Sequence, residues 1–474
     1  MGMNHVDLLD NLDALFNPST VAVIGASENP AKLGFHVMKS LKGGGFEGRI
    51  VPVNPGAAGI FGMPAVPSIS KFEGKIDLAV IVLPAGAVPG VMEECGRKGV
   101  RAIVLITAGF KEIDYPLGST LQQALAEKAN ALRIPVIGPN TFGMVNRHRG
   151  LNASFTPEFS MLATGPVALV SQSGGISHLL AFMAMRQDVR IGKVIGLGNR
   201  LNIDFAEMTH YLREDPDTGV VLLYLEGLDD PRALMEAASA YRGKKPIIAY
   251  KTGRGERGNQ ASRSHTGTLA GSRPIYEGAL KQAGVFFADS TETLLDLGKA
   301  MATCPLPRGP RVAILSGQAG PAMAACDVCQ TEGLQVTTFE PDTQETIHGL
   351  LPPLALRSNP VDMGPAWYDS EAIRGIVKAV MADGNVDSIL ILMMFASANR
   401  DAINSLSGLL SEWNQKKPVV GCLVSPPGIW DETISMMEKE GALVNLPTPE
   451  RAASVMAALW KYAHMLDDRG WRKK

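Results

Sequence analysis

Short apolar segments alternate with longer amphipathic segments along most of this 474-residue chain. A short segment that is apolar throughout is typical of a strand buried on both faces of a parallel sheet, with helices as the connections. In the first part of the chain the expected strands are Val21–Gly25, Gly48–Val53, Leu78–Leu83, Ala102–Ile106 and Pro135–Gly138. The alternation predicts an α/β fold, with residues 1–145 forming one doubly wound domain.

Two further series of apolar segments follow. The expected strands of the second series are Val167–Val170, Lys193–Gly196, Val220–Leu225 and Pro246–Tyr250, and those of the third are Val312–Leu315, Ser388–Met394 and Val419–Val424. Between the two series lies Pro305–Pro310, whose composition is typical of a linker. The chain is therefore expected to contain three domains, at residues 1–145, 146–305 and 306–474, as its length also suggests.

The second and third series repeat two features in the same order. GPVALVSQSGG (165–175) parallels GPRVAILSGQAGP (309–321), and GNRLNIDFAEM (198–208) parallels SNPVDMGPAW (358–367). We interpret this as a duplicated flavodoxin-like unit. The alternative is that two α/β units converged on similar turns.

The composition excludes several functions. With 45 basic and 47 acidic residues the formal charge is −2, which argues against nucleic acid and anionic membranes as partners. Five cysteines in so long a chain make no disulfide framework. Cys326 and Cys329 lack the second pair that a zinc site needs, so no metal site is expected. Without an apolar run of about 18 residues or a signal peptide, a cytoplasmic protein is expected.

Small and polar residues follow the expected strands of the first domain. In an open parallel sheet the carboxyl ends of the strands meet at one crevice, which predicts a nucleotide-like ligand there. The candidate residues are Gly25, Ser27, Lys32, Asn54, Pro55, Thr107, Ala108, Gly109 and Asn140. Ser27 replaces the second glycine of the dinucleotide fingerprint, so this is not that motif. A purely structural turn is the alternative for residues 21–34.

The next candidate is an anion site after the first strand of the second series. Its residues are Ser171, Gln172, Ser173, Gly174 and Gly175. Short side chains and glycines at a helix N-terminus suit a phosphate, because the backbone N–H groups and the helix dipole both favour an anion. The alternative is a tight connection that needs glycine for close packing.

A long polar loop, residues 251–272, carries His265 among Ser, Thr, Gly and Arg residues. A neutral imidazole in such a loop can attack phosphorus near pH 7, and Arg254, Arg257 and Arg263 could offset phosphate charge. A solvated surface histidine is the alternative. Glu226 favours the reactive histidine, since it follows the strand Val220–Leu225 at the same sheet edge, and a carboxylate can fix the imidazole tautomer. Alternatively, Glu226 is a capping acid.

Eight segments together resemble the α subunit of the NDP-forming acyl-CoA synthetases, a group that includes ADP-forming acetate–CoA ligase; succinyl-CoA synthetase α is more distantly similar. They are VAVIGASENPAKLGF, VNPGAAGIFG, GPNTFGMVN, VALVSQSGG, YLEGLDD, SRSHTGTLAGS, GQAGP and NPVDM, in family order. The resemblance implies a Rossmann-like CoA-binding domain followed by two flavodoxin-like doubly wound domains. One departure is Thr141, where the family often has cysteine after G-P-N.

The resemblance also implies roles for the candidate residues. Coenzyme A would lie with its phosphates near Gly25, Ser27 and Lys32 and run beside Thr107–Gly109, with Asn140 near its thiol. His265 would be phosphorylated transiently, oriented by Glu226, and Ser171–Gly175 would hold the phosphoryl group. The expected reaction interconverts carboxylic acid, CoA and ATP with acyl-CoA, ADP and phosphate, through an acyl phosphate and a phosphohistidine.

No ATP-grasp sequence follows Asp401, where 73 residues remain. The resemblance therefore implies a separate ATP-grasp β subunit that would bind ATP or ADP with Mg²⁺. Two other functions stay open, an NAD-dependent α/β enzyme and a CoA-binding regulatory protein without ligase activity. The glycine pattern counts against the first, and Glu226 with His265 against the second. The acid, ADP or GDP, the physiological direction and the oligomeric state are not predicted.

Overall fold

The computed structural model describes residues 11–113, 116–253, 273–354, 356–413 and 416–470. Its first sheet has five parallel strands. The strand order is β2-β1-β5-β6-β7. These strands are β1 (Thr20–Ile24), β2 (Arg49–Val53), β5 (Leu78–Ile81), β6 (Ala102–Leu105) and β7 (Val136–Ile137). They confirm the five predicted strands. The short hairpin β3 (Gly59–Ile60) and β4 (Met63–Pro64) was not predicted.

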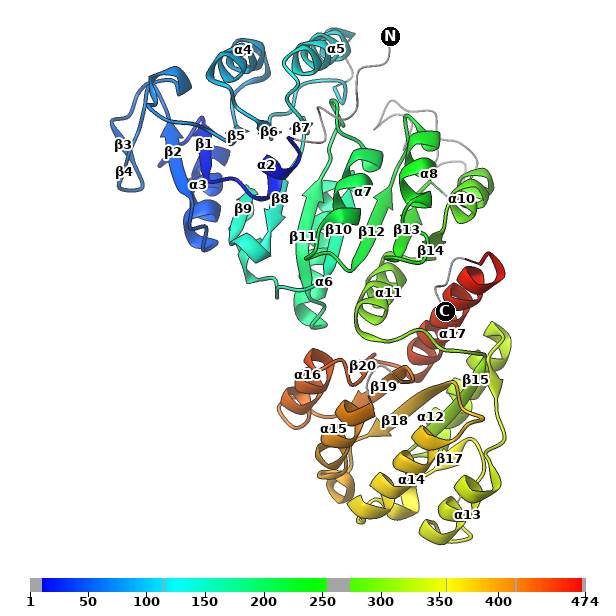
Figure 1. Ribbon diagram of the computed structural model, residues 1–474. Helices are drawn as coiled ribbons and strands as arrows, with labels where there is room; N and C mark the ends of the chain where they lie inside the picture. The colour runs from blue at the N-terminus through cyan, green and yellow to red at the C-terminus, as the bar shows by residue number, and fades with distance from the viewer. Residues whose placement is uncertain (1–10, 114–115, 254–272, 355, 414–415, 471–474) are drawn as a thin grey trace. The chain divides into compact units, whose positions relative to one another are not determined.

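Helices cover both faces of this sheet, because alternate strand residues point in opposite directions. The helices are α2 (Asp13–Phe16), α3 (Leu33–Gly43), α4 (Val88–Lys98) and α5 (Pro116–Ala131). Val21 and Val23 belong to the core beneath α3, whereas Ala22 and Ile24 belong to the core beneath α4 and α5. Figure 1 shows α4 and α5 on one side of the sheet and α3 on the other. The sheet is buried on both faces, as strands apolar throughout predict.

The second sheet has seven strands in the order β14-β13-β12-β10-β11-β8-β9. They are β8 (Gly143–Asn146), β9 (Leu151–Ser154), β10 (Val167–Ser171), β11 (Ile191–Gly196), β12 (Val220–Leu225), β13 (Ile247–Lys251) and β14 (Val285–Phe287). The four predicted strands are confirmed. Strands β8, β9 and β14 were not predicted; β8 and β9 are antiparallel to their neighbours, whereas β14 is parallel to β13. The helices are α6 (Gly174–Arg186), α7 (Phe205–Glu214), α8 (Pro231–Ser239), α10 (Arg273–Gln282) and α11 (Thr291–Thr303).

The first two sheets share a core. Residues of α3 pack in one hydrophobic cluster with residues of β8, β9, β10, β12 and α7. Contacts accordingly place both sheets in one compact unit, residues 1–295, and residues 296–474 in a second unit. The division into three domains at 145/146 and 305/306 therefore stays a prediction.

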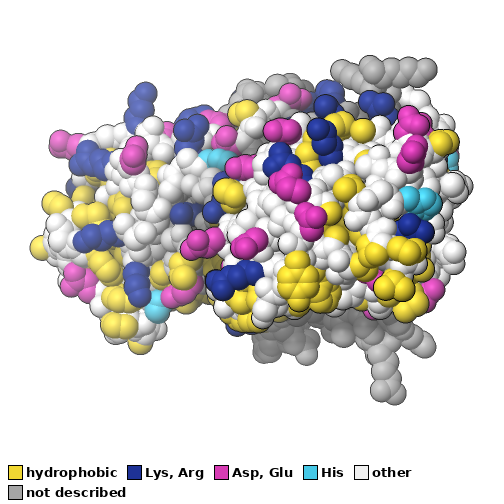
Figure 2. Space-filling view, turned by 90° about the horizontal axis from the view of Figure 1, so that it is seen from below, with side chains coloured by type: hydrophobic (Ala, Val, Ile, Leu, Met, Phe, Trp, Pro, Cys, Tyr) yellow, Lys and Arg dark blue, Asp and Glu magenta, His cyan; other side chains and the backbone are white. Residues whose placement is uncertain are grey.

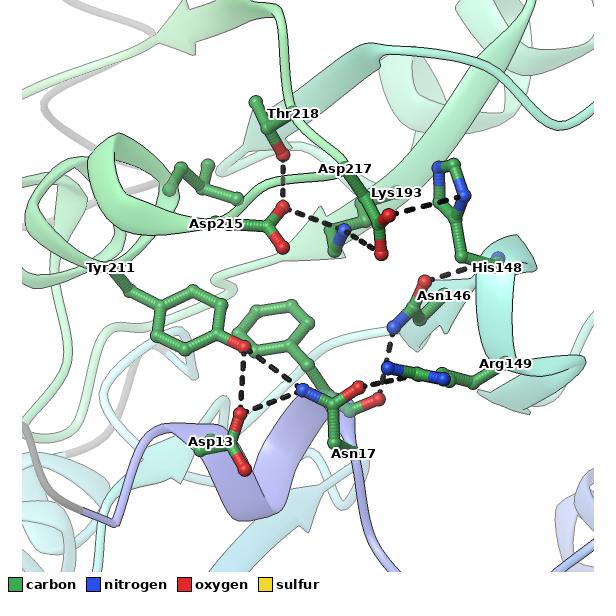
Figure 3. Close-up of polar contacts among 12 residues, drawn as sticks. Asp13, Asn17, Asn146, His148, Arg149, Lys193, Tyr211, Asp215, Asp217 and Thr218 are labelled. Carbon is green, nitrogen blue, oxygen red and sulfur yellow. Dashed lines mark hydrogen bonds and ion pairs between the residues drawn. The ribbon is translucent and has the colours of Figure 1, made fainter.

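A polar network also fastens α2 to the second sheet (Figure 3). The Tyr211 hydroxyl donates to Asp13 at 3.2 Å, and the Phe16 and Tyr211 rings stack at 4.5 Å. Beside them Lys193, 2% exposed, forms an ion pair with Asp215 at 2.7 Å. This network lies at the amino end of β12, away from the edge where the candidate phosphate loop lies.

The second unit contains a parallel sheet in the order β16-β15-β18-β19-β20, with β17 also beside β15. The strands are β15 (Arg311–Ser316), β16 (Gln335–Val336), β17 (Val361–Asp362), β18 (Ser388–Met394), β19 (Val419–Val424) and β20 (Val444–Asn445). The helices are α12 (Ala319–Glu332), α13 (Pro341–Leu350), α14 (Ser370–Ala382), α15 (Ala402–Trp413), α16 (Asp431–Lys439) and α17 (Pro449–Asp468). Helices α12 and α17 pack side by side, and α14 and α15 cover the core of the other face.

The two flavodoxin-like sheets have matching strand orders. Reading from the C-terminal strand, β14-β13-β12-β10-β11 corresponds to β20-β19-β18-β15 followed by β16 and β17. This agrees with the repeat predicted from the sequence.

No helix among the described residues is long and apolar enough to cross a membrane. On the face drawn in Figure 2, basic and acidic side chains are interspersed and do not form a patch of one sign.

Candidate functional site

A cavity of about 720 Å³ lies at the carboxyl edge of the first sheet. This volume falls within the roughly 300–1,000 Å³ typical of small-molecule sites. Seven predicted residues line the cavity: Gly25, Ser27, Lys32, Asn54, Pro55, Thr107 and Ala108. Leu33 and Gly34, in the first turn of α3, line it too, so the positive end of that helix borders the cavity. The arrangement suits a ligand that carries phosphate groups.

Gly25 shapes the floor of this cavity. Its φ is +97°, in the region that favours glycine. A Cβ at this position would lie 2.6 Å from the carbonyl oxygen of Val82. The Gly25 N–H donates to Val53 O at 3.1 Å, and the Asn54 amide donates to Ala26 O at 2.8 Å. These bonds join the turns after β1 and β2, which therefore form one wall of the cavity.

The turn after β6 is held differently. Thr107 donates from its hydroxyl to Leu83 O at 2.7 Å, which fixes the turn against the end of β5. The Gly109 N–H donates to the Glu112 carboxylate, and Gly109, which was predicted for this site, is not among the residues that line the cavity. Burial raises the pKa of Glu112, but hydrogen bonds from the Gly109 N–H and the Asn199 amide outweigh burial and leave that pKa below its ordinary value.

The loop Ser171–Gly175 connects β10 to α6. Its bend is fixed internally, because the Ser171 hydroxyl donates to Ser173 O at 3.0 Å and Ser173 N donates back to the Ser171 hydroxyl. Ser173 is the N-cap of α6, and its hydroxyl accepts the Ile176 N–H. Apart from the backbone of α6 itself, no atom of the described residues lies within 4 Å of a Cβ built at Gly174 or Gly175. The described part of the chain therefore leaves open space beside the first turn of α6.

Glu226 lies directly beside this loop. Gln172 accepts the backbone N–H groups of Glu226 at 2.6 Å and of Gly227 at 3.1 Å. Buried Lys251, at the end of β13, donates to the backbone oxygens of Glu226 at 2.8 Å and Thr252 at 2.7 Å. Burial lowers the pKa of Lys251. The ends of β10, β12 and β13 are thus tied together where the chain continues toward residue 254.

Asn140 lies at a second, smaller cavity of about 20 Å³ and not at the large one. The small cavity is lined by Lys111, Asn140, Gln172, Gly198, Asn199, Arg200 and Glu226. Three predicted residues from two sheets, Asn140, Gln172 and Glu226, therefore meet at one place. Lys111, Asn199 and Arg200 were not predicted. The signal that could have found Arg200 is its position just after β11, at the edge that carries the phosphate loop.

His178 supports the phosphate loop from within α6. Its Nδ1 lies 2.7 Å from Gly174 O, and its Nε2 lies 2.8 Å from the Thr156 hydroxyl. The ring packs among Phe142, Phe155, Phe159 and Phe182. These contacts fix the ring and, through Gly174, the start of α6.

The second unit contains a similar hydrogen-bonded loop after its first strand, but with a different residue at the position of Glu226. The Ser316 hydroxyl donates to Gln318 O at 2.6 Å, and Gln318 accepts the Met394 N–H at 3.2 Å. Ser171 pairs with Tyr224 and Ser316 with Leu392, so Met394 occupies the position of Glu226. At this position the first copy therefore has a carboxylate and the second copy has a methionine.

His265, together with Arg254, Arg257 and Arg263, lies outside the described residues. Among the residues that are described, no group of three or more His, Cys, Asp or Glu side chains is arranged to hold a metal ion.

Comparisons with known proteins identify two family models along the chain. Residues 19–147 match the family described as a CoA binding domain, and residues 164–301 match the succinyl-CoA ligase like flavodoxin domain. The α subunit of ADP-forming acetate–CoA ligase II of Pyrococcus furiosus is 36% identical over 454 residues, which are 95% of this chain and 96% of that subunit.

Two further comparisons bear on chain organisation. The ADP-forming acetate–CoA ligase of Methanocaldococcus jannaschii is 41% identical over 346 residues, which are 73% of this chain and 48% of that protein. The structure of a Ca. Korarchaeum cryptofilum acetyl-coenzyme A synthetase in complex with phosphate and ADP matches with a TM-score of 0.88 and 33% identity. That match covers 96% of this chain and 97% of the other.

Proposed function

Because this chain belongs to the family of the α subunits of ADP-forming acetate–CoA ligases, we propose that it is the α subunit of an acid–CoA ligase. The complete enzyme interconverts a carboxylic acid, CoA and ATP with acyl-CoA, ADP and phosphate. The observation that carries this proposal is the meeting of Glu226, Gln172 and the Ser171–Gly175 loop at the edge where β13 leads toward His265.

Coenzyme A occupies the large cavity in this proposal. Lys32 and the first turn of α3 face its phosphates, and the turns after β1, β2 and β6 enclose it. The small cavity, with Asn140, holds the end of the molecule that reacts. Gly25 leaves room that a side chain would fill.

Phosphate then reacts at the loop Ser171–Gly175. An oxygen of phosphate attacks the thioester carbon, a C–O bond forms, and the C–S bond breaks with its electron pair on the sulfur of CoA. The open N-terminus of α6 offers backbone N–H groups to the phosphate oxygens. The product is an acyl phosphate.

His265 takes the phosphoryl group in the next step. One ring nitrogen attacks phosphorus, and the P–O bond to the acyl group breaks, releasing the carboxylate. Glu226 accepts the N–H of the other ring nitrogen, which fixes the tautomer and stabilises the cationic ring. Gln172 and Lys251 hold the Glu226 backbone at the place where this contact is needed.

An ATP-grasp β subunit completes the reaction in our proposal. It binds ADP with Mg²⁺ and receives the phosphoryl group from His265. The length of the Methanocaldococcus protein supports a second half, since this chain matches only 48% of it. A cytoplasmic location is part of the same proposal.

The test is reconstitution. The purified chain and an ATP-grasp subunit from the same source are incubated with acetyl-CoA, phosphate, ADP and Mg²⁺, and ATP formation is measured. We expect ATP only when both polypeptides are present, and loss of ATP formation in Glu226→Gln. Activity of this chain alone, or full activity of Glu226→Gln, would contradict the proposal.

A further inference from the structure

Two loops from different sheets interlock at the small cavity. Asn199 N donates to Pro139 O at 2.9 Å and Leu201 N donates to Gly138 O at 2.8 Å. A Cβ at Gly198 would lie 2.3 Å from Pro139 O. The loop after β7 and the loop after β11 are therefore in direct backbone contact.

Each loop holds a side chain at the cavity from an unusual backbone conformation. Asn140 has a φ of +56° and Arg200 a φ of +59°. Non-glycine residues adopt this region rarely, arginine more rarely than asparagine, and such residues cluster at functional sites. Both line the same cavity with Glu226, which points to a use for these two side chains.

Arg200 has hydrogen-bonding capacity that the protein does not use. It is 6% exposed. Its guanidinium contacts Asp204 at 2.8 Å and Asp229 at 3.0 Å, so its charge is balanced. Nη1 makes the contact with Asp204 and Nη2 the contact with Asp229, but among the described residues the Nε donor lacks a hydrogen-bond acceptor. A buried donor without an acceptor is costly, so an external acceptor is expected.

The volume and the lining residues of the small cavity limit which hydrogen-bond acceptor can bind there. Its volume of about 20 Å³ holds roughly one water-sized group. Lys111 and Asn140 add further donors, while Glu226 places a carboxylate on the same wall. A whole phosphate is too large for this volume. A single carbonyl oxygen fits, because it is neutral before reaction and attracts the donors more strongly as it gains charge.

We propose that Arg200 and Asn140 form an oxyanion pocket that holds the thioester carbonyl oxygen of the acyl-CoA. When the phosphate oxygen attacks the carbonyl carbon, the π electron pair moves onto this oxygen, which the two side chains stabilise. The pair returns as the C–S bond breaks and the thiolate of CoA leaves. This inference rests on the proposed ligase function and adds the catalytic residues of its first step.

The test compares two routes to the same phosphorylated protein. In the first, labelled inorganic phosphate and acetyl-CoA phosphorylate this chain in its complex with the ATP-grasp subunit. In the second, labelled ATP does so through that subunit, with no thioester. The variants are Arg200→Lys, which keeps the charge opposite Asp204 but lacks the guanidinium donors, and Asn140→Gly, which suits the positive φ. The matched control is Arg213→Lys, which changes a partly buried arginine paired with exposed Glu214.

We expect Arg200→Lys to slow the acetyl-CoA route by about a hundredfold, and Asn140→Gly by about tenfold or more, with the rate of the ATP route unchanged. Arg213→Lys should behave as wild type in both. Equal slowing of both routes, or no slowing of either, overturns the inference. If Arg200→Lys fails to fold, Asn140→Gly decides alone. Wild-type protein unlabelled by either route would instead overturn the proposed function.

Discussion

The side-chain oxygen of Gln172 accepts the backbone N–H of Glu226 at 2.6 Å. This bond joins the loop after β10 to the end of β12, and a second bond from Gly227 reinforces it. The position of the Glu226 carboxylate thus depends on a neighbouring side chain that does no chemistry itself.

Gln172→Leu removes the acceptor of both N–H groups. We expect the free energy of unfolding to fall by about 1–3 kcal/mol and phosphorylation of the chain to slow, because Glu226 is no longer held. Urea unfolding and the labelling rate measure the two effects. Asn146→Leu is the control, since Asn146 makes a comparable buried bond to Phe16 O at 2.9 Å. It should lose stability without a specific loss of labelling; equal labelling of both variants would contradict the role of Gln172.

Gly25→Ala tests the large cavity as the CoA site. The added methyl group would meet Val82 O at 2.6 Å in a backbone conformation unfavourable for alanine. We expect CoA affinity, measured by isothermal titration calorimetry, to fall by at least about tenfold, with ATP-driven labelling retained. Gly43→Ala is the matched control, because no atom lies within 4 Å of its Cβ and its φ is not in the positive range. Unchanged CoA affinity of Gly25→Ala would place CoA elsewhere.

The lowered pKa of Glu112 predicts that the free energy of unfolding depends on pH. Its pKa lies below its ordinary value, because hydrogen bonds from Gly109 and Asn199 outweigh burial. A carboxyl group with a depressed folded-state pKa stabilises the fold fully above the unfolded pKa, and this stabilisation is lost as pH falls through the folded pKa. Glu112→Gln should therefore be less stable than wild type at pH 7 by about 1–3 kcal/mol.

The difference should shrink as the pH falls below the ordinary pKa of glutamate, about 4.3, and through the lower pKa of folded Glu112. Denaturant unfolding across this range measures it, with exposed Glu73→Gln as the control. A difference that is constant from pH 7 to pH 3 would show that the charge of Glu112 contributes nothing.

The Lys193–Asp215 pair (Figure 3) should matter for stability and not for chemistry. Asp215→Ala leaves the Lys193 ammonium buried with Asp217 at 3.9 Å as its remaining ion-pair contact. We expect a loss of about 3–5 kcal/mol, partly recovered by adding Lys193→Met. Exposed Glu214→Ala should change little. Phosphorylation measured well below the melting temperature should stay at the wild-type rate; a selective loss would assign this network a catalytic role.

The sequence predicted most of the parallel strands, because a strand buried on both faces is apolar throughout, but it did not predict the short parallel strands β14, β16, β17 and β20. It missed β8 and β9, in which apolar residues stand beside Asn146, Asn152 and Ser154. Those polar side chains are satisfied by bonds such as Asn146 to Phe16 O and Asn152 to Thr156 O. Side-chain hydrogen bonds of this kind leave no periodic pattern in the sequence.

Candidate residues were predicted best where they follow a strand. Gly25, Asn54 and Thr107 reach one cavity for that reason. Arg200 also follows a strand, but its αL conformation and its contacts with Asp204 and Asp229 depend on the folding of two segments together, so its role needed the structure. Asn140 was predicted from the family to lie near the thiol end of CoA, and its place beside Glu226 needed the structure.

Transient phosphorylation of His265 is the central claim, and site mapping tests it most directly. The complex is labelled with radioactive phosphate in the presence of acetyl-CoA, and the label is located by mass spectrometry and by its stability in acid and base. We predict an acid-labile, base-stable phosphate on His265, absent from His265→Asn and present in His464→Asn, which changes an exposed histidine of α17. Label that persists in His265→Asn, or that maps to another residue, would contradict the account.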